Sequence, residues 1–359
     1  MPDNNIIPSQ LESIFKNYSI GQRNKQEQFV NNLEILDTKT QKLFTPKNDL
    51  KVKIKNDYLF KVFSSININN SMVNDGNKQG VFITLTLPSK YHNLDNIEII
   101  KEGYNQLNQT FRQIYNNFNN DGKKLSVKFV RVIEPHESFI PHLHAILYID
   151  KQYLKHFHNH LDNILAPVSL VREGWTKFIS FKSYRDNVGR FEYEIIKDVS
   201  RCSAYLLKYV KKSLKCHDNL DYYHLMNGWK TYNEIRNFTY SSGLAIPRYI
   251  FDKVCKTLKL EMGKDYNKGD NILKIIGDLI DIHQVVYDDH EAKRIDKIGL
   301  NSLYNVLIVK EKIVNESFKL IDNIMVKLKK VYYKLREFQI IRKSDNLIIY
   351  DKSRFILMR

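Results

Sequence analysis

The chain has 359 residues and carries 56 Lys plus Arg against 40 Asp plus Glu, which gives a formal net charge of +16. Such an excess of positive charge favours a polyanionic partner, above all a nucleic acid. There are three cysteines without a Cys-x-x-Cys pair, and no apolar run approaches the roughly 18 residues that span a bilayer. We therefore expect no disulfide framework, no zinc ribbon and no membrane role, and the lack of a signal peptide indicates a cytoplasmic protein.

The predicted elements, taken in chain order, begin with a polar N-terminal extension over residues 1–50, which holds one helix over 22–36. Residues 51–245 form the core domain, which opens with a strand over 52–65 and a loop over 67–80. Apolar periodicities predict the other core elements: strands over 81–87, 126–134, 142–149, 168–196 and 234–241, and helices over 95–117, 151–164 and 200–215. Antiparallel strands flanked by helices make this an α+β fold.

Residues 246–359 are predicted as a mainly helical C-terminal domain. Long apolar periodicities over 272–286 and 303–337 favour helices, and a short strand pair over 347–350 and 355–358 ends the chain. No Gly-x-x-x-x-Gly-Lys-Ser/Thr loop occurs, so a built-in helicase motor is not supported. We expect the helical stripe to be plain core or an oligomerisation surface, ahead of a DNA-recognition surface.

The most informative stretch is a His-x-His pair within the strand that runs from Pro141 to Ile149. Successive side chains of a strand point to opposite faces, so His142 and His144 share one face while the other face is apolar. A buried imidazole without a partner costs roughly 1–3 kcal/mol. The partner is either a metal ion or a hydrogen-bonding group of the core.

A carboxylate is expected beside the two histidines. The preceding strand ends in Glu134, and the segment that follows has a proline at each end, which is typical of a connection. A hairpin would bring Glu134 beside His142 and His144, and two imidazoles with one carboxylate and open positions are typical of a catalytic metal site. Glu137 and His136 in the connection stay open as substitutes for Glu134.

Downstream, the helix over 200–215 brings two phenols near an amine. Tyr205, Lys208 and Tyr209 are three and four residues apart, so they share a face with Lys212, opposite the apolar positions of the helix. Two candidate nucleophiles and a cation therefore point the same way. The alternative is an ordinary amphipathic helix whose tyrosines cover the edge of the core.

Several cations near this helix are candidate phosphate contacts: Lys211, Lys212, Lys215 and, in the strand over 234–241, Arg236. Single-stranded nucleic acids also stack their bases on aromatic rings, and the chain has 22 tyrosines and 19 phenylalanines. Both features fit a partner that is a single-stranded nucleic acid.

A second histidine pair, His156 and His160, lies at i, i+4 on the helix over 151–164. That spacing would let both rings bind one metal ion. Because no carboxylate or cysteine is arranged to complete the site, we expect these histidines to be an ordinary part of the helix surface.

Three motifs, in this order, resemble the rolling-circle replication initiators of the HUH endonuclease superfamily: the strand Phe82-Ile83-Thr84-Leu85-Thr86, the Pro-His-x-His stretch and Tyr-x-x-Lys-Tyr. The two-tyrosine spacing is most similar to the gene A type of phage replication protein. Trp229, followed by Ile235 to Ser241, resembles the strand that closes the nuclease core of that group. The resemblance covers about residues 80–245 and makes 51–245 an HUH nuclease domain.

This resemblance implies an enzyme that nicks single-stranded DNA at a replication origin. Tyr205 or Tyr209 would attack the phosphate and stay linked to the 5′ end as a phosphotyrosine, with Lys208 stabilising negative charge. Mg²⁺ or Mn²⁺ would be held by His142, His144 and Glu134. A host helicase would unwind the duplex, and a later strand exchange would rejoin the DNA.

Two other functions stay open. Transposases and mobilisation relaxases of the same superfamily use the same chemistry, although relaxases usually place the tyrosine before the His motif. A non-catalytic DNA-binding regulator could keep the fold without the activity. The complete set of His, Tyr and Lys positions argues against that regulator.

Overall fold

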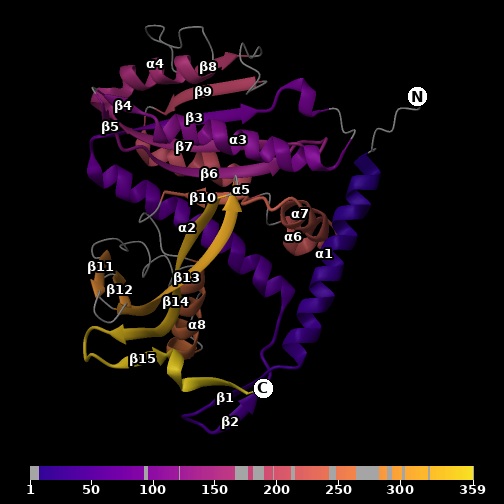
Figure 1. Cartoon of the computed structure of the whole chain (residues 1–359). Helices are drawn as coiled ribbons and strands as arrows, with labels where there is room; N and C mark the ends of the chain where they lie inside the picture. Colours follow the sequence, from indigo (N-terminus) through magenta and orange to yellow (C-terminus); the bar gives the residue numbers. More distant parts are fainter. Residues whose placement is uncertain are drawn as a thin grey trace. The chain divides into compact units, whose positions relative to one another are not determined.

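The chain folds into two units in the computed structural model (Figure 1). The first comprises Met1–Phe29 and Asn48–Ala245, and the second comprises Val30–Lys47 and Ile246–Arg359. Residues 1–50, predicted as one extension, are therefore divided between the two units. The structure describes residues 8–92, 96–120, 122–165, 177–180, 190–196, 198–211, 215–241, 248–263, 283–288, 293–300, 304–321 and 324–358.

The first unit is built on a six-stranded antiparallel sheet with the order β10-β6-β7-β3-β9-β8. This sheet and the helices around it confirm the predicted α+β fold. The predicted strand over 168–196 comprises β8 and β9, and the residues between these strands lie outside the described part. The strands are β3 (Lys78–Thr86), β6 (Lys128–Pro135), β7 (Pro141–Asp150), β8 (Lys177–Ser180), β9 (Arg190–Ile196) and β10 (Phe238–Tyr240), with a separate short ribbon of β4 (Asn119–Asn120) and β5 (Lys123–Lys124).

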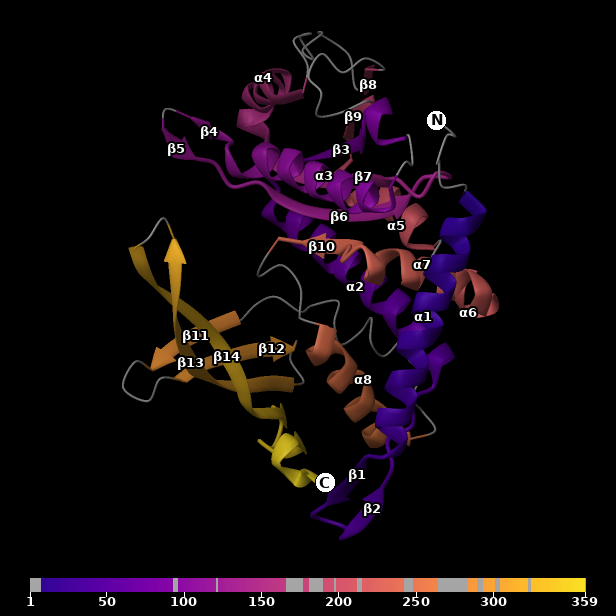
Figure 2. The ribbon, with the colours of Figure 1, turned by 45° about the vertical axis from the view of Figure 1, so that its right-hand side comes forward.

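Helices cover both faces of this sheet, and Figure 2 shows α3 and α2 on opposite sides of its strands. Residues of α3 and α4 pack against one face, in a core that includes Ile83 and Leu143. Residues of α2 and α5 pack against the other face, around Phe82 and Ile146. The helices of this unit are α1 (Pro8–Asn31), α2 (Leu50–Asp75), α3 (Glu98–Asn116), α4 (Leu154–Leu165), α5 (Cys202–Lys211), α6 (Lys215–Asp218) and α7 (Leu220–Tyr232).

Helix α2 replaces the strand predicted over 52–65 and most of the loop predicted over 67–80, whose last residues begin β3, so both predictions are wrong. Asp49 caps its first turn by accepting a hydrogen bond from the Val52 amide, and Gly76 ends it with a left-handed φ of 69°. Asn67 and Asn69, in the predicted loop, are buried instead. Asn69 donates to the Ser200 carbonyl at 3.1 Å and accepts from the Tyr148 hydroxyl at 3.1 Å, which satisfies its amide.

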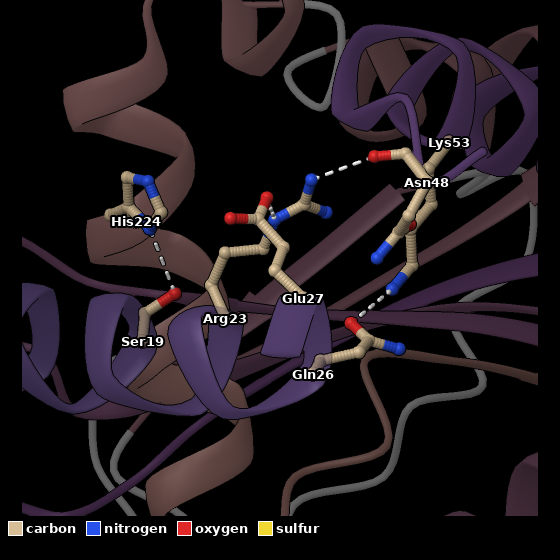
Figure 3. Close-up of polar contacts among 7 residues, drawn as sticks. All are labelled: Ser19, Arg23, Gln26, Glu27, Asn48, Lys53 and His224. Atoms are coloured by element: carbon tan, nitrogen blue, oxygen red, sulfur yellow. Dashed lines mark hydrogen bonds and ion pairs between the residues drawn. The ribbon is translucent and has the colours of Figure 1, made fainter. Parts of the chain in front are cut away.

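Helix α1 is tied to its neighbours by polar contacts along one side (Figure 3). The Arg23 guanidinium donates to the Asn48 carbonyl at 2.7 Å, and Ser19 shares a hydrogen bond of 3.1 Å with His224 of α7. Close to that contact, α1 and α7 approach so closely that a Cβ atom on Gly228 would overlap the Phe15 carbonyl. Phe15 is fully buried in the core of the first unit.

The second unit is built mainly of strands, so the prediction of a mainly helical C-terminal domain is wrong. The residues over 303–337 fall largely within one long antiparallel hairpin of β13 and β14, and residues 283–286 belong to β11; residues 272–282 lie outside the described part. The sheet order is β11-β12-β13-β14-β15, and a second sheet has the order β16-β1-β2. The elements are α8 (Arg248–Met262), β1 (Glu34–Asp37), β2 (Lys42–Phe44), β11 (His283–Asp288), β12 (Lys293–Leu300), β13 (Tyr304–Ile321), β14 (Ile324–Arg342), β15 (Ile348–Asp351) and β16 (Phe355–Met358).

Alternating burial explains the strands of this unit. Val306 and Ile308 of β13 are buried and pair with Ile340 and Phe338 of β14, which are also buried. Branched apolar residues two positions apart favour strands, although the neighbouring apolar residues also fit a helical spacing. The two short strands predicted at the chain end do form, but β15 pairs with β14 and β16 pairs with β1. Among the helices that the structure describes, none is both long enough and apolar enough to cross a membrane.

Candidate active site

The hairpin of β6 and β7 brings the predicted carboxylate to the predicted histidines. Glu134 lies directly opposite His142 in the register of the two strands, and its Oε1 atom accepts a hydrogen bond from His144 Nε2 at 3.3 Å. His144 is 5% exposed, and Glu134 and His142 are half-buried. The alternatives Glu137 and His136 are exposed in the turn between the strands. Glu134 is therefore the carboxylate that lies with the histidine pair.

A hydrogen bond from the indole of Trp229 holds the turn of this hairpin. Its Nε1 donates to the Phe139 carbonyl at 2.8 Å, and Phe139 holds a left-handed φ of 62°, which is unusual for an aromatic residue. The Phe139 ring also packs edge-on against Phe15, with 5.5 Å between ring centroids. The register that sets Glu134 opposite His142 therefore has tertiary support from α1 and α7.

Strand β3 supplies two threonines on the other side of the histidines. Thr84 lies opposite His144 and Thr86 lies opposite His142. The hydroxyl of Thr84 is 3.0 Å from His144 Nδ1, and the hydroxyl of Thr86 is 3.3 Å from His142 Nε2. When a neutral His144 donates from Nε2 to Glu134, its Nδ1 is an acceptor, and the Thr84 hydroxyl can donate to it.

The donor set fits a divalent cation by its chemistry. It has two imidazoles and one carboxylate on neighbouring strands, and Thr84 orients the second nitrogen of His144 as outer groups do for metal-binding histidines. In the described part of the chain, no three His, Cys, Asp or Glu side chains are already arranged as a metal cage. His144 bonds instead to Glu134 and Thr84, and His142 bonds to Thr86.

Helix α5 brings both tyrosines to this face of the sheet. Its buried row is Cys202, Leu206 and Val210, and the row of Tyr205 and Tyr209 lies beside it. The tyrosines are thus half-buried at the margin of the packed face, and the prediction that they lie opposite the apolar positions is wrong. A helix turns by 100° per residue, so Tyr205 and Tyr209, each one position before a buried residue, still reach the sheet.

The two phenols sit in different surroundings. The Tyr209 ring stacks on the His144 ring, with 3.7 Å between centroids and 16° between planes. The Tyr205 hydroxyl donates to Glu194 Oε1 of β9 at 3.0 Å, and that hydrogen bond, with a smaller contribution from burial, raises the pKa of Tyr205. Lys208 is exposed, and its Nζ atom lies 5.5 Å from the centroid of the Tyr209 ring.

The predicted phosphate contacts are only partly described. Lys211 ends α5 and is exposed, and the exposed Arg236 lies just before β10, with its amide donating to the Tyr104 hydroxyl at 3.0 Å. Lys212 lies outside the described residues, and so does the side chain of Lys215 at the start of α6.

The comparisons with known proteins agree with this arrangement. Residues 18–216 match the family model of the bacteriophage replication gene A protein (GPA). The match covers more than half of the chain. The chain belongs to this family. The gene A resemblance is thereby confirmed, and the family makes the chain a phage replication protein whose partner is DNA. The match spans α5 and the β6–β7 hairpin, and searches of curated proteins and of solved structures gave no match.

Several residues of the site gave no sequence signal of their own. The sequence predicts Phe82, Thr84 and Thr86 only as parts of a strand, whereas in the structure the Phe82 ring centroid lies 5.6 Å from that of Tyr205 and 6.3 Å from that of Tyr209. Glu194 lies in the segment that is predicted as one strand over 168–196. The alternation of acidic with aromatic residues along 191–194 was the one hint that Glu194 shares a face with the site.

The second histidine pair is explained by hydrogen bonds to backbone. His156 Nε2 donates to the Asn119 carbonyl at 2.5 Å and His160 Nε2 donates to the Ile114 carbonyl at 3.0 Å. The Phe118 ring lies 5.4 Å from the His156 ring and 5.3 Å from the His160 ring. His160 thus bonds to a carbonyl in the last turn of α3 and His156 bonds to a carbonyl of β4, so both rings are part of the ordinary surface of their helix.

Proposed function

We propose that this chain is an initiator nuclease that cuts single-stranded DNA at a replication origin by tyrosine attack. The observation that carries the proposal is the stacking of Tyr209 on His144 at 3.7 Å, because it joins the tyrosine helix to the histidine strand across a long stretch of sequence. With Tyr205 one turn away, both phenols are within reach of one phosphate. The gene A family supports the same substrate and the same step of replication.

The proposed metal ligands are His142, His144 and Glu134. A bound Mg²⁺ or Mn²⁺ would polarise a non-bridging oxygen of the scissile phosphate and orient that phosphate for in-line attack. Thr84 and Thr86 hold the outer sides of the two rings, which fixes their orientation before the substrate arrives.

The protein's own groups carry out the exchange. The phenol oxygen of Tyr205 or Tyr209 forms a new phosphodiester with the 5′ side, and the 3′ oxygen leaves as a hydroxyl. At pH 7 only about one in a thousand free tyrosines is ionised, which corresponds to roughly 4 kcal/mol. The Lys208 ammonium, next to Tyr209, can stabilise negative charge on the phenol or on the phosphate. Because one ester replaces another, no ATP is required.

Two tyrosines allow successive rounds of cutting. One phenol can hold the first strand while the other attacks the regenerated origin, so that the protein need not release the DNA. The origin strand would lie across the exposed cations Lys211 and Arg236, with Lys212 and Lys215 as further contacts. Unwinding of the duplex is left to a host helicase, and an oligomer is compatible with this scheme.

Two alternatives remain as outcomes of experiment. A transposase or relaxase would use the same site on a different DNA, and a regulator would bind DNA without forming an adduct. The match to a phage replication family favours initiation.

The metal ligands are tested by His142→Ala and His144→Ala. Loss of a ligand should lower the rate of nicking of origin DNA in Mn²⁺ by more than about 100-fold, because metal activation is worth several kcal/mol. His156→Ala is the matched control, since that ring bonds only to a backbone carbonyl away from the site. Full nicking by both site variants would remove the metal assignment.

A further inference from the structure

The two tyrosines of α5 differ in one contact that the proposed function does not use. The Tyr205 hydroxyl donates to Glu194 Oε1 at 3.0 Å, whereas the Tyr209 ring lies flat on His144. Glu194 is half-buried on β9, and its Cα lies opposite Phe82 of β3, so its side chain is on the face that carries the site. Tyr205 is therefore bonded to a carboxylate of a neighbouring strand.

We propose that Glu194 is the general base for Tyr205, so that the two tyrosines are activated by different groups. This inference rests on the proposed function. As the Tyr205 oxygen bonds to phosphorus with a lone pair, its proton passes to Glu194. The bonding electrons of the phosphorus–O3′ bond leave with O3′, which takes a proton from solvent water. When a 3′ hydroxyl later attacks the phosphotyrosine and the Tyr205 oxygen leaves, Glu194 returns a proton to it.

The resting hydrogen bond keeps the proton on Tyr205. A free carboxyl group has a pKa near 4.3 and a free phenol near 10, and the Glu194 carboxylate raises the pKa of Tyr205 further. Formation of a phenolate before attack is thus disfavoured at this position. During attack the phenol proton becomes acidic, and a carboxylate at 3.0 Å is within the range for direct proton transfer.

The two routes give opposite expectations for Glu194→Gln. If Tyr205 attacked as a preformed phenolate, removing the carboxylate would ease ionisation and would maintain or raise the rate. If Glu194 accepts the proton during attack, the same change should lower the rate by about 10²–10⁴-fold. The sign of the effect therefore separates the two mechanisms.

The experiment uses the full chain with one tyrosine at a time. Adduct formation with radiolabelled single-stranded origin DNA in Mn²⁺ is measured against pH for Tyr209→Phe and for Tyr205→Phe, each with and without Glu194→Gln. We expect Glu194→Gln to slow the adduct at Tyr205 by about 10²–10⁴-fold and to convert its flat profile around neutral pH into a steady rise with pH. Glu194→Asp should restore part of the rate, and the adduct at Tyr209 should change by less than about threefold.

Glu102→Gln on the exposed surface of α3 is the matched control for the loss of one carboxylate. Equal slowing of both tyrosines, or an unchanged pH profile at Tyr205, would overturn the role of Glu194 while leaving the nickase intact. Absence of adducts from the unmodified chain on every strand supplied would instead overturn the proposed function, and this inference with it.

Discussion

The ring of His144 joins three elements of the site. Thr84 of β3 bonds to Nδ1, Glu134 of β6 bonds to Nε2, and Tyr209 of α5 covers one face of the ring. Sequence alone predicted the histidine and the carboxylate, because strand alternation and a proline-flanked connection fix their relative positions. It could not predict the partner of Tyr205, because nothing in the local pattern says which strand will lie beside α5.

His158 provides a residue-scale prediction about stability. It is 8% exposed, neither ring nitrogen has a hydrogen-bond partner, and burial lowers its pKa to about 4. The unfolded chain, with a histidine pKa near 6.5, binds this proton more readily than the folded chain. Stability contributed by the neutral ring is complete above pH 6.5 and is lost as the pH falls toward 4.

The expected size of this loss is on the order of 2 kcal/mol, since one pKa unit corresponds to about 1.4 kcal/mol. Urea unfolding of wild type and His158→Leu should be compared at pH 7.5 and 5.0. We expect the variant to lose less stability between these values than the wild type. An identical pH dependence in both proteins would show that His158 does not titrate on unfolding.

At the scale of elements, the alternating strands around the site were predicted closely, and α2 and the C-terminal hairpin were not. In α2, apolar and polar residues alternate at its start and asparagines follow, so its sequence resembles a strand and a loop. The decisive signals were the cap at Asp49 and the left-handed Gly76. In β13 and β14 the apolar residues fit both the helical and the strand periodicity, and the pairing of the two segments with each other favours strands.

Alanine substitutions at two glycines should change the free energy of unfolding in opposite directions, because only Gly228 lies at the close approach of α1 and α7. Gly228→Ala would set a methyl group against the Phe15 backbone and should lower the free energy of unfolding by about 1–3 kcal/mol. Gly21→Ala, in α1, meets open space and should raise it by about 0.5–1 kcal/mol through helix propensity.

Tryptophan fluorescence in urea is a suitable measurement, because Trp229 of α7 is buried in the core of the first unit. A neutral effect of Gly228→Ala would mean that α1 does not pack on α7 as described.

At the scale of the whole molecule, the excess of 16 positive charges fits a DNA partner, and the site face carries exposed cations next to the tyrosines. Residues 8–29 were set apart in the sequence as an extension, yet Leu11 and Phe15 are fully buried in the core of the first unit. The polar composition of α1 gave no sign that it belongs to the core, because two buried side chains on one face suffice to pack a helix against its neighbours. Tertiary contact, rather than local pattern, decides where such a segment belongs.

Lys211 tests whether the site face binds DNA. If it contacts a phosphate, Lys211→Gln should reduce the slope of log affinity against log salt by about 0.7 for single-stranded DNA. The matched control is Lys155→Gln, which removes one charge from α4 on the opposite face of the sheet. Equal slopes for wild type and Lys211→Gln in fluorescence anisotropy titrations would exclude this contact.

The most direct test of tyrosine attack at this site is covalent capture of DNA by the purified chain. Single-stranded DNA that covers the gene and its flanks is incubated with Mn²⁺, Mg²⁺ or EDTA, and adducts are separated on denaturing gels and mapped by mass spectrometry. We predict a metal-dependent adduct on Tyr205 or Tyr209 that Tyr205→Phe/Tyr209→Phe abolishes. An adduct that persists in this double variant, or salt-sensitive binding without an adduct on any strand, would contradict it.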